Sequence, residues 1–461
     1  MAHDDDQPRV ETPRHFERPW LRSERPLPRR VVRPLERFLK LESGSAALLM
    51  AAALVALAWS NISTASYDDF WATEVIFELG PIELHEDLGH LVNDLLMAVF
   101  FYVVSLEVKR ELVFGALRDR ASASVPVAAA LGTMLGGGLT YLAVNLSGGE
   151  PSGWAIPIAT DIAFALGVLG IAGRRAPPEL RAFLLTLAVV DDLGTIAVIA
   201  VFYTSGVELG WLAGAAGFVL AVVVLQRIGV RHLVAYVVLA GLLWYAVLES
   251  GVHATIAGVV MGFLTPSRAL HSQDVTGEAI AEQLTQIADS PDVEVDEAAL
   301  DDVRRLAVEA VSPLARMEAV LHPWSAYLIL PLFALANAGV PVTADALGDA
   351  LTSQVGLGIF LGLVIGAPAI GVALTWAILR FTPARMPEGL DMRAIGAVSP
   401  LKGIGFTVAI FISVLAFENE TAREQAKLSI LLASTLAGVI GAIALNVLGS
   451  GRRAGRRTRS A

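Results

Sequence analysis

Five ionisable side chains lie inside strongly apolar stretches of this 461-residue chain, and they are the first candidates for chemistry. They are Asp94, Asp161, the adjacent pair Asp191 and Asp192, and Lys402. An ionisable group at membrane depth is costly, so each is a functional candidate by default. The alternative is that an aspartate of this kind only pairs with a neighbour or with a helix end.

The pair Asp191 and Asp192, in the segment LAVVDDLG, is the strongest signal. Neighbouring side chains on a helix point about 100° apart, so only one of the two can point straight at a given ligand. Two buried carboxylates this close cannot both stay charged without a cation or a proton. Oxygen ligands suit hard cations, and no soft thiolate ligand is available. The pair therefore predicts a site that holds either protons or a hard cation.

The composition places these residues in a membrane protein. Hydrophobic residues make up 55% of the chain and charged residues 17%, and the mean hydropathy is +0.61. A globular domain has about 25% charged residues. The chain has no cysteine, which excludes a disulfide scaffold, a zinc-thiolate site, an iron–sulfur cluster and cysteine catalysis. No resident cofactor is expected.

The predicted fold is an all-α polytopic membrane protein with twelve transmembrane helices, each needing roughly 20 apolar residues. The domain plan is a tail over 1–43, spans 1–8 over 44–264, an acidic loop over 265–322, spans 9–12 over 323–449 and a basic tail over 450–461. The expected spans are 44–62, 89–114, 123–146, 155–172, 180–203, 207–226, 232–249, 251–264, 323–339, 354–380, 394–416 and 426–449.

Two stretches between the spans have their own character. Residues 74–84 alternate in polarity around a Gly-Pro break and predict a short β-hairpin. The 265–322 loop carries 12 acidic against 4 basic residues and is expected to be helical in its second half at most.

Basic residues predict the orientation of the spans. With the N-terminus inside, 31 of the 34 Lys and Arg residues are cytoplasmic, and only Arg423 and Lys427 are outside. Such a bias is typical of cytoplasmic loops. It predicts cytoplasmic termini, an extracytoplasmic hairpin and a cell-membrane location.

Two spans contain helix breakers. Pro157 interrupts span 4, and Pro400, Gly403 and Gly405 interrupt span 11. A proline inside a helix removes a backbone hydrogen bond, which produces either a simple kink or a discontinuous helix. If both helices are discontinuous, spans 3–5 and 10–12 form two inverted three-helix repeats, each with a broken middle helix.

From about residue 40 to about 450 the chain resembles NhaA-type sodium/proton antiporters. The broken-helix pattern is a known feature of that family, so it belongs to the resemblance. The matching blocks are NDLLMAVFF with LEVKREL (93–112), GWAIPIATDIAFALGVL (153–169), LAVVDDLG (187–194), SGVHATIAG (250–258), LHPWSAYLILPLFALANAG (321–339) and GIGFT (403–407).

The resemblance implies exchange of cytoplasmic Na⁺ or Li⁺ for external protons, activated by pH and serving sodium and pH homeostasis. It is a transport function by alternating access, with no enzymatic step and no nucleic-acid partner. Asp191 and Asp192 would bind cation and protons competitively, Thr160 and Asp161 would lie where the two broken helices cross, and Asp94 would line the cytoplasmic funnel. The 74–84 hairpin would form a homodimer.

A charged cluster at the cytoplasmic mouth matches the residues that the family uses in pH activation. Its members here are Glu107, Arg110, Glu111, Glu318 and His322. Ala319 stands where the family has another histidine, and the alternative is a set of solvated ion pairs of little energetic weight.

The larger departure from the family is in span 10, where Ala367 stands between Gly366 and Pro368 in place of a lysine. Lys402 is unusual in the opposite sense, since the family has a small residue there. We hypothesise that Lys402 supplies the relocated positive charge; the alternative is that it extends to the membrane interface. The number of protons exchanged per cation depends on this point.

Three other functions compete with exchange. A sodium-coupled symporter needs a polar solute pocket, for which Lys402 is the only clear cationic candidate. An intramembrane aspartyl protease also uses two aspartates, but the Gly-x-Gly-Asp pattern of that family is absent. A membrane sensor would use the acidic 265–322 loop to bind a regulatory partner.

Overall fold

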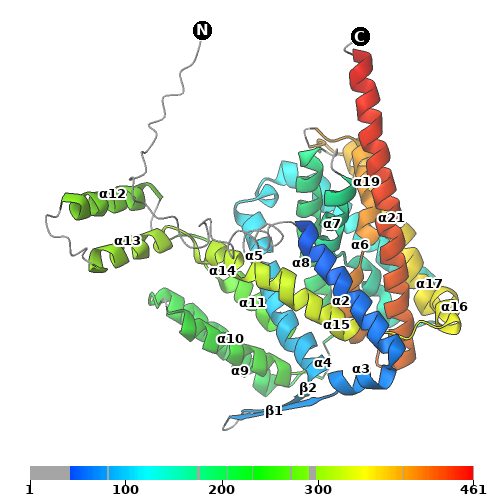
Figure 1. Ribbon diagram of the computed structural model, residues 1–461, viewed down its shortest axis with the longest axis horizontal. Coiled ribbons are helices and arrows are strands. Elements are labelled where there is room, and N and C mark those ends of the chain that lie inside the picture. The colour runs from blue at the N-terminus through cyan, green and yellow to red at the C-terminus, as the bar shows by residue number, and fades with distance from the viewer. Residues whose placement is uncertain are drawn as a thin grey trace, which may run out of the picture.

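The computed structural model describes residues 42–79, 82–173, 177–204, 206–230, 232–269, 273–289, 297–387 and 389–459. The predicted tail over 1–43 lies almost entirely outside these stretches, as do residues 460 and 461. The helices pack into one bundle, with the long helix α21 (Glu420–Arg459) along one side and a small hairpin at one end (Figure 1).

Within the described stretches, nine helical segments are long and apolar enough to cross a bilayer, and a bent pair makes a tenth. The chain is therefore a multi-span membrane protein, as predicted. The elements that build these segments are α2 (Glu42–Ile62), α4 (Leu88–Leu91) with η3 (Val92–Leu96) and α5 (Met97–Val113), α6 (Arg120–Asn145), η5 (Pro151–Ile158) with α7 (Ile162–Ala172), α8 (Pro178–Phe202), α9 (Leu209–Arg227), α14 (Pro313–Trp324) with η6 (Ser325–Ile329) and α15 (Leu330–Asn337), α17 (Gln354–Leu361) with η7 (Gly362–Gly366) and α18 (Ala367–Phe381), the bent pair α19 (Met392–Val398) with η8 (Ser399–Gly403) and α20 (Phe406–Ala416), and α21.

The two other predicted spans are shorter than expected. They correspond to α10 (Leu233–Glu249) and α11 (Thr255–Leu264), which have 17 and 10 residues. A straight crossing needs roughly 20 residues, so length alone supports ten spans and not twelve. The chain turns between the two helices at Gly251, whose φ of +76° lies in the region that favours glycine.

The predicted acidic loop contains more helix than expected. Helix α12 (Gln273–Asp289) occupies its first half, where no helix was predicted, and α13 (Glu297–Glu309) its second half. Both lie beside the bundle at one edge (Figure 1). Helix α14 starts at Pro313, capped by the Ser312 side chain, so the ninth predicted span begins about three turns before residue 323.

The predicted hairpin is present. Strand β1 (Glu74–Leu79) pairs antiparallel with β2 (Ile82–Asp87), with Glu74 opposite Asp87 and Leu79 opposite Ile82. The second strand runs three residues beyond the predicted end at 84, and the Gly-Pro turn lies outside the described residues. Three short helices connect other elements: α3 (Thr64–Trp71), η4 (Ala116–Arg118) and α16 (Ala344–Thr352).

Helix α6 lies at the centre of the packing around the site, because glycines let other backbones approach it closely. A Cβ atom added at Gly136 would lie 2.2 Å from the carbonyl oxygen of Gly366, and one added at Gly137 would lie 2.1 Å from that of Pro157. Helix α6 therefore contacts both η7 and η5 backbone to backbone. These contacts place η5, which precedes the break of span 4, and the π-helical turn η7 of span 10 at the same level of α6.

Candidate functional site

The span predicted to break at Pro157 is interrupted at the expected place. The tight helix η5 ends at Ile158, residues 159–161 are extended or irregular, and α7 begins at Ile162. Asp161 caps α7, accepting a hydrogen bond from the Phe164 backbone at 3.0 Å. A carboxylate at this position also faces the positive end of the helix dipole.

The second interruption is in the bent pair. Helix α20 leaves the segment Met392–Gly403 at an angle of 46°. The side chain of Thr407 in α20 donates a hydrogen bond to Asp161 Oδ2 at 2.6 Å, and its backbone N–H donates to the same oxygen at 3.2 Å. Asp161 is therefore a buried carboxylate whose hydrogen-bonding capacity is largely satisfied by two helix starts.

The backbones of the two interruptions touch directly. The Asp161 N–H donates to the carbonyl of Ile404 at 2.6 Å. The Thr160 hydroxyl lies 3.2 Å from both the Lys402 carbonyl and Asp191 Oδ2, so its single proton is shared between these acceptors. Thr160, Asp161, Asp191 and Lys402, which are separated by up to 242 residues in sequence, thus form one centre.

Lys402 and Asp191 form a buried ion pair. Lys402 Nζ contacts Asp191 Oδ2, and each side chain is 1% exposed. Thr133 of α6 lies at 3.5 Å from the other carboxylate oxygen, while it donates more closely to the Ala130 carbonyl at 2.8 Å. Lys402 does not extend to the membrane interface, so the alternative placement of this side chain is excluded.

Asp192 has a different environment from its neighbour, as the 100° separation predicts. It is 8% exposed and makes no ion pair or hydrogen bond with the residues that the structure describes. The other carboxyl groups whose charges act on it are Glu107 and Asp161. Asp192 is therefore the buried carboxyl group of the pair that has no polar partner among the described residues.

The predicted mouth cluster forms across α5 and α14. Arg110 pairs with Glu318, and His322 Nε2 lies 3.8 Å from Glu107 Oε1. Glu111 does not join these pairs, because its carboxylate accepts the Ala116 N–H at 3.1 Å in the following turn. The Arg110 and His322 side chains are 49% and 59% exposed, so both pairs lie at a solvent-accessible surface.

Asp94 lies apart from this cluster. It sits in η3, one short helix (α4) after the hairpin, whereas Glu107 lies 13 residues further along the same span. At 1.5 Å per residue the separation is about 20 Å. Asp94 and the mouth cluster therefore lie toward opposite ends of the span, and the funnel role that the family resemblance implies for Asp94 stays a prediction.

Three residues near these groups had not been singled out from the sequence. Thr133 and Thr407 contact the buried carboxylates, and Lys109 donates to the carbonyls of Phe263 and Thr265 at 2.7 and 2.6 Å, at the end of α11. Lys109 and Thr407 lie inside matched sequence blocks. Thr133 lies in an ordinary apolar stretch, and only its hydroxyl sets it apart.

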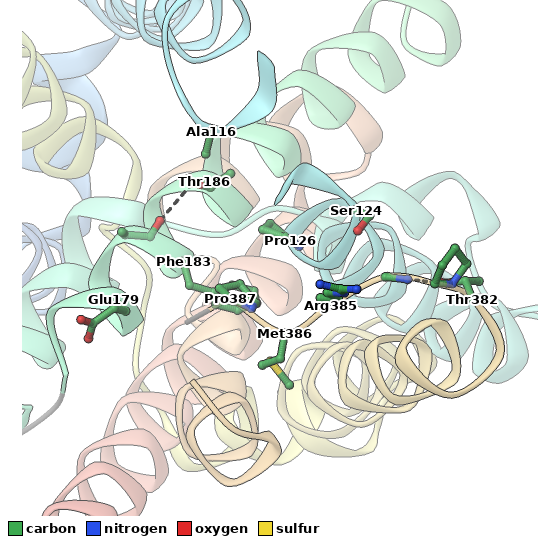
Figure 2. A pocket seen from close by; sticks show the side chains of 13 residues that line it. Ala116, Ser124, Pro126, Glu179, Phe183, Thr186, Thr382, Arg385, Met386 and Pro387 are labelled. Atoms are coloured by element: carbon green, nitrogen blue, oxygen red, sulfur yellow. Dashed lines mark hydrogen bonds between the residues drawn. The ribbon is translucent and has the colours of Figure 1, made fainter. Parts of the chain in front are cut away.

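A cavity of about 1080 Å³ lies beside the site without containing it. Figure 2 shows its lining at the start of α6 and α8 and along residues 382–387, with Glu179, Thr186 and Arg385 among the polar side chains. None of the four residues of the charged centre lines it. The centre is a closed set of carboxylates, hydroxyls, one ammonium group and backbone carbonyls.

A helical membrane protein with a buried ion pair where two helix breaks meet belongs to the class of ion transporters. The family model described as Na⁺/H⁺ antiporter 1 matches residues 36–445. The chain belongs to this NhaA family of Na⁺/H⁺ antiporters, which are transporters and not enzymes.

Curated relatives agree with the family model over nearly the whole chain. The Na⁺/H⁺ antiporter NhaA 2 of Myxococcus xanthus is 43% identical over 422 residues, covering 90% of each protein. The NhaA antiporter of Oleidesulfovibrio alaskensis is 41% identical and covers 92% of this chain and 96% of its own length. That of Salmonella typhimurium is 43% identical and covers 88% and 96%.

Proposed function

We propose that this antiporter moves cytoplasmic Na⁺ or Li⁺ outward and external protons inward through one site at Asp191 and Asp192. The observation that carries the proposal is the asymmetric pair: Asp191 is bound by Lys402, and the Asp192 carboxylate has no polar partner among the described residues. Asp191 contacts Thr160 and Lys402 where the two helix breaks meet, and Asp192 is the next residue on the same helix. Irregular backbone of this kind is tolerated at membrane depth only where it is buried in protein or lines a cavity.

Competition at this site couples the two fluxes. A carboxylate that holds a proton cannot also bind a cation, and a ligand shifts a two-state protein only through differential affinity for its states. Protons loaded from outside are carried inward and released where the pH is higher, and the freed carboxylates bind Na⁺ for the return. Acid on the cytoplasmic side keeps the carboxyls protonated and so opposes cation binding.

Lys402 serves in this proposal as the positive partner of Asp191. In this proposal Lys402 takes the place of the family lysine that is missing at Ala367. The two segments are close in space, because a Cβ added at Gly403 would lie 2.4 Å from the Leu363 carbonyl in η7. Gly371, one turn beyond Ala367, packs against Thr133, which faces Asp191. A lysine on either element can therefore approach the same carboxylate.

The role of Lys402 can be tested by removing its positive charge and then placing a lysine at position 367. We expect Lys402→Ala to alter the rate, the voltage response or the pH profile of exchange, and Ala367→Lys in that background to restore them. Unchanged transport by Lys402→Ala would refute the role. Currents on a solid-supported membrane would show at the same time whether two protons or one accompany each cation.

The topology proposed is twelve crossings, counting α10 and α11 as shorter ones, with both termini in the cytoplasm of a cell membrane. Spans 3–5 and 10–12 are then inverted repeats, with Asp161 and Thr160 in one broken helix and Lys402 in the other. The mouth cluster at Glu107 and Glu318 is cytoplasmic and adjusts activity to pH. Asp94 then lies on the outer side.

The hairpin is the proposed dimer contact. It is extracytoplasmic in this topology, and its first strand exposes Ile76 and Phe77. A two-stranded sheet is marginal alone, and two exposed apolar side chains favour pairing with a second copy. Cross-linking in membranes between hairpins carrying introduced cysteines tests this contact, because the native chain has none.

The main test of the function is neutralisation of both carboxyls. We expect vesicles with the double variant Asp191→Asn, Asp192→Asn to hold a pH gradient when Na⁺ or Li⁺ is added, whereas the wild-type protein collapses it. Thr186→Val on the same helix is the matched control, since its hydroxyl already bonds the Ala182 carbonyl. Gradient collapse by the double variant at the wild-type rate would refute the proposal.

A further inference from the structure

Thr195 in α8 is a buried residue whose hydroxyl has no hydrogen-bond partner in the part of the chain that the structure describes. Its exposure is 1%. A helical threonine commonly donates its hydroxyl proton to a carbonyl of the preceding turn. Thr186 on the same helix does so at 3.0 Å, and Thr204 just past its end does so at 2.9 Å. Thr195 departs from the behaviour of its neighbours.

The position of Thr195 on α8 places its hydroxyl close to the two aspartates. It follows Asp191 by four residues and Asp192 by three, and side chains at these spacings lie about 5–6 Å apart on one helix face. Ile199, one turn further on the same face, is also buried, whereas Val201 on another face of α8 is 70% exposed. Thr195 thus continues the face that carries the carboxylate pair.

The two aspartates differ in how far their oxygens are engaged by neighbouring side chains. Asp191 is engaged by Lys402, Thr160 and Thr133, and Asp192 is engaged by none of the described residues. A hydroxyl oxygen offers two lone pairs, and hard cations are bound by several such oxygens together. A carboxylate and a hydroxyl from one turn of α8 can therefore bind the same ion.

We infer that Thr195 is a further ligand of the transported cation, acting together with Asp192. The inference rests on the proposed function and adds to it a residue that sets cation affinity. A hydroxyl provides an oxygen for Na⁺ or Li⁺ without adding a second proton acceptor. It therefore favours the cation over the proton in their competition for Asp192.

The test separates affinity from turnover. Thr195→Val removes the hydroxyl and nearly preserves the shape, and its exchange is measured in vesicles at alkaline pH, where protons compete least. We expect the Na⁺ concentration for half-maximal exchange to rise about threefold to tenfold, the effect of one lost polar contact, with the maximal rate preserved. Thr195→Ser returns the hydroxyl and should return the wild-type value.

Two comparisons separate loss of the hydroxyl from a change in packing. Thr186→Val should keep the wild-type Na⁺ dependence, because its hydroxyl bonds within the helix. An unchanged half-saturating concentration in Thr195→Val would overturn the inference, and so would an equal rise in Thr195→Ser, since packing and not the hydroxyl would then be responsible. Failure of the proposed function would instead appear as absent exchange in the wild-type protein.

Discussion

Removal of the Lys402 ammonium group tests the buried ion pair most directly. In Lys402→Met, the described residues leave Asp191 two hydroxyl partners, Thr160 at 3.2 Å and Thr133 at 3.5 Å. Both members of the original pair are 1% exposed. Breaking a buried pair from one side costs about 3–5 kcal/mol, because a charge stays buried without its partner. We expect a loss of this size in the free energy of unfolding at neutral pH.

The loss of unfolding free energy in Lys402→Met should become smaller as the pH falls. Asp191 can escape the penalty by taking up a proton, and that uptake becomes easier by about 1.4 kcal/mol for each unit by which the pH falls. The difference between wild type and Lys402→Met should therefore shrink as the pH is lowered. Adding Asp191→Asn should recover much of the stability, because the double variant buries no unpaired charge.

The assay is unfolding in detergent followed by tryptophan fluorescence, which the 8 tryptophans of the chain supply. Arg110→Met is the matched control: it breaks a pair in which Arg110 is 49% exposed, and such pairs are worth about 0–1 kcal/mol. A loss below about 1 kcal/mol in Lys402→Met, in the range of that exposed pair, would refute the reasoning. A loss that did not change with pH would do the same.

Two further substitutions test the packing around the site. Gly136→Ala should destabilise the protein by about 1–3 kcal/mol, because its Cβ would lie 2.2 Å from the Gly366 carbonyl. The control Gly214→Ala on α9 meets no atom within 4 Å and should be neutral or stabilising. Coinciding unfolding curves of the two variants would contradict the close contact at Gly136. Tyr67→Phe should cost about 1–2 kcal/mol, since the Tyr67 hydroxyl donates to Leu335 at 2.8 Å and accepts from Gly339 at 3.3 Å. Burial raises the pKa of the Tyr67 phenol, so it remains a donor at alkaline pH and the loss should be the same at pH values across the working range of the antiporter.

Local patterns in the chain predicted the membrane class and the main breaks. Long apolar runs predict spans because a bilayer requires about 20 such residues, and Pro157 and Pro400 predict interruptions because proline removes a helical hydrogen bond. The hairpin followed from alternating polarity around a Gly-Pro turn. Length by itself does not decide whether the short apolar helices α10 and α11 are spans. The helix α12 was not predicted, because its polar sequence lacks the apolar pattern that marks a span.

Asp161, Asp191, Asp192 and Lys402 could be singled out before any fold was known, because a charged residue inside a long apolar run is visible in the sequence. That Lys402 pairs with Asp191, and that Asp192 has no polar partner among the described residues, became visible only in the folded structure, because Lys402 and Asp191 lie on different helices. Their distance depends on backbone contacts at glycines of α6 and at the two helix breaks, and no local pattern of residues encodes such a long-range distance.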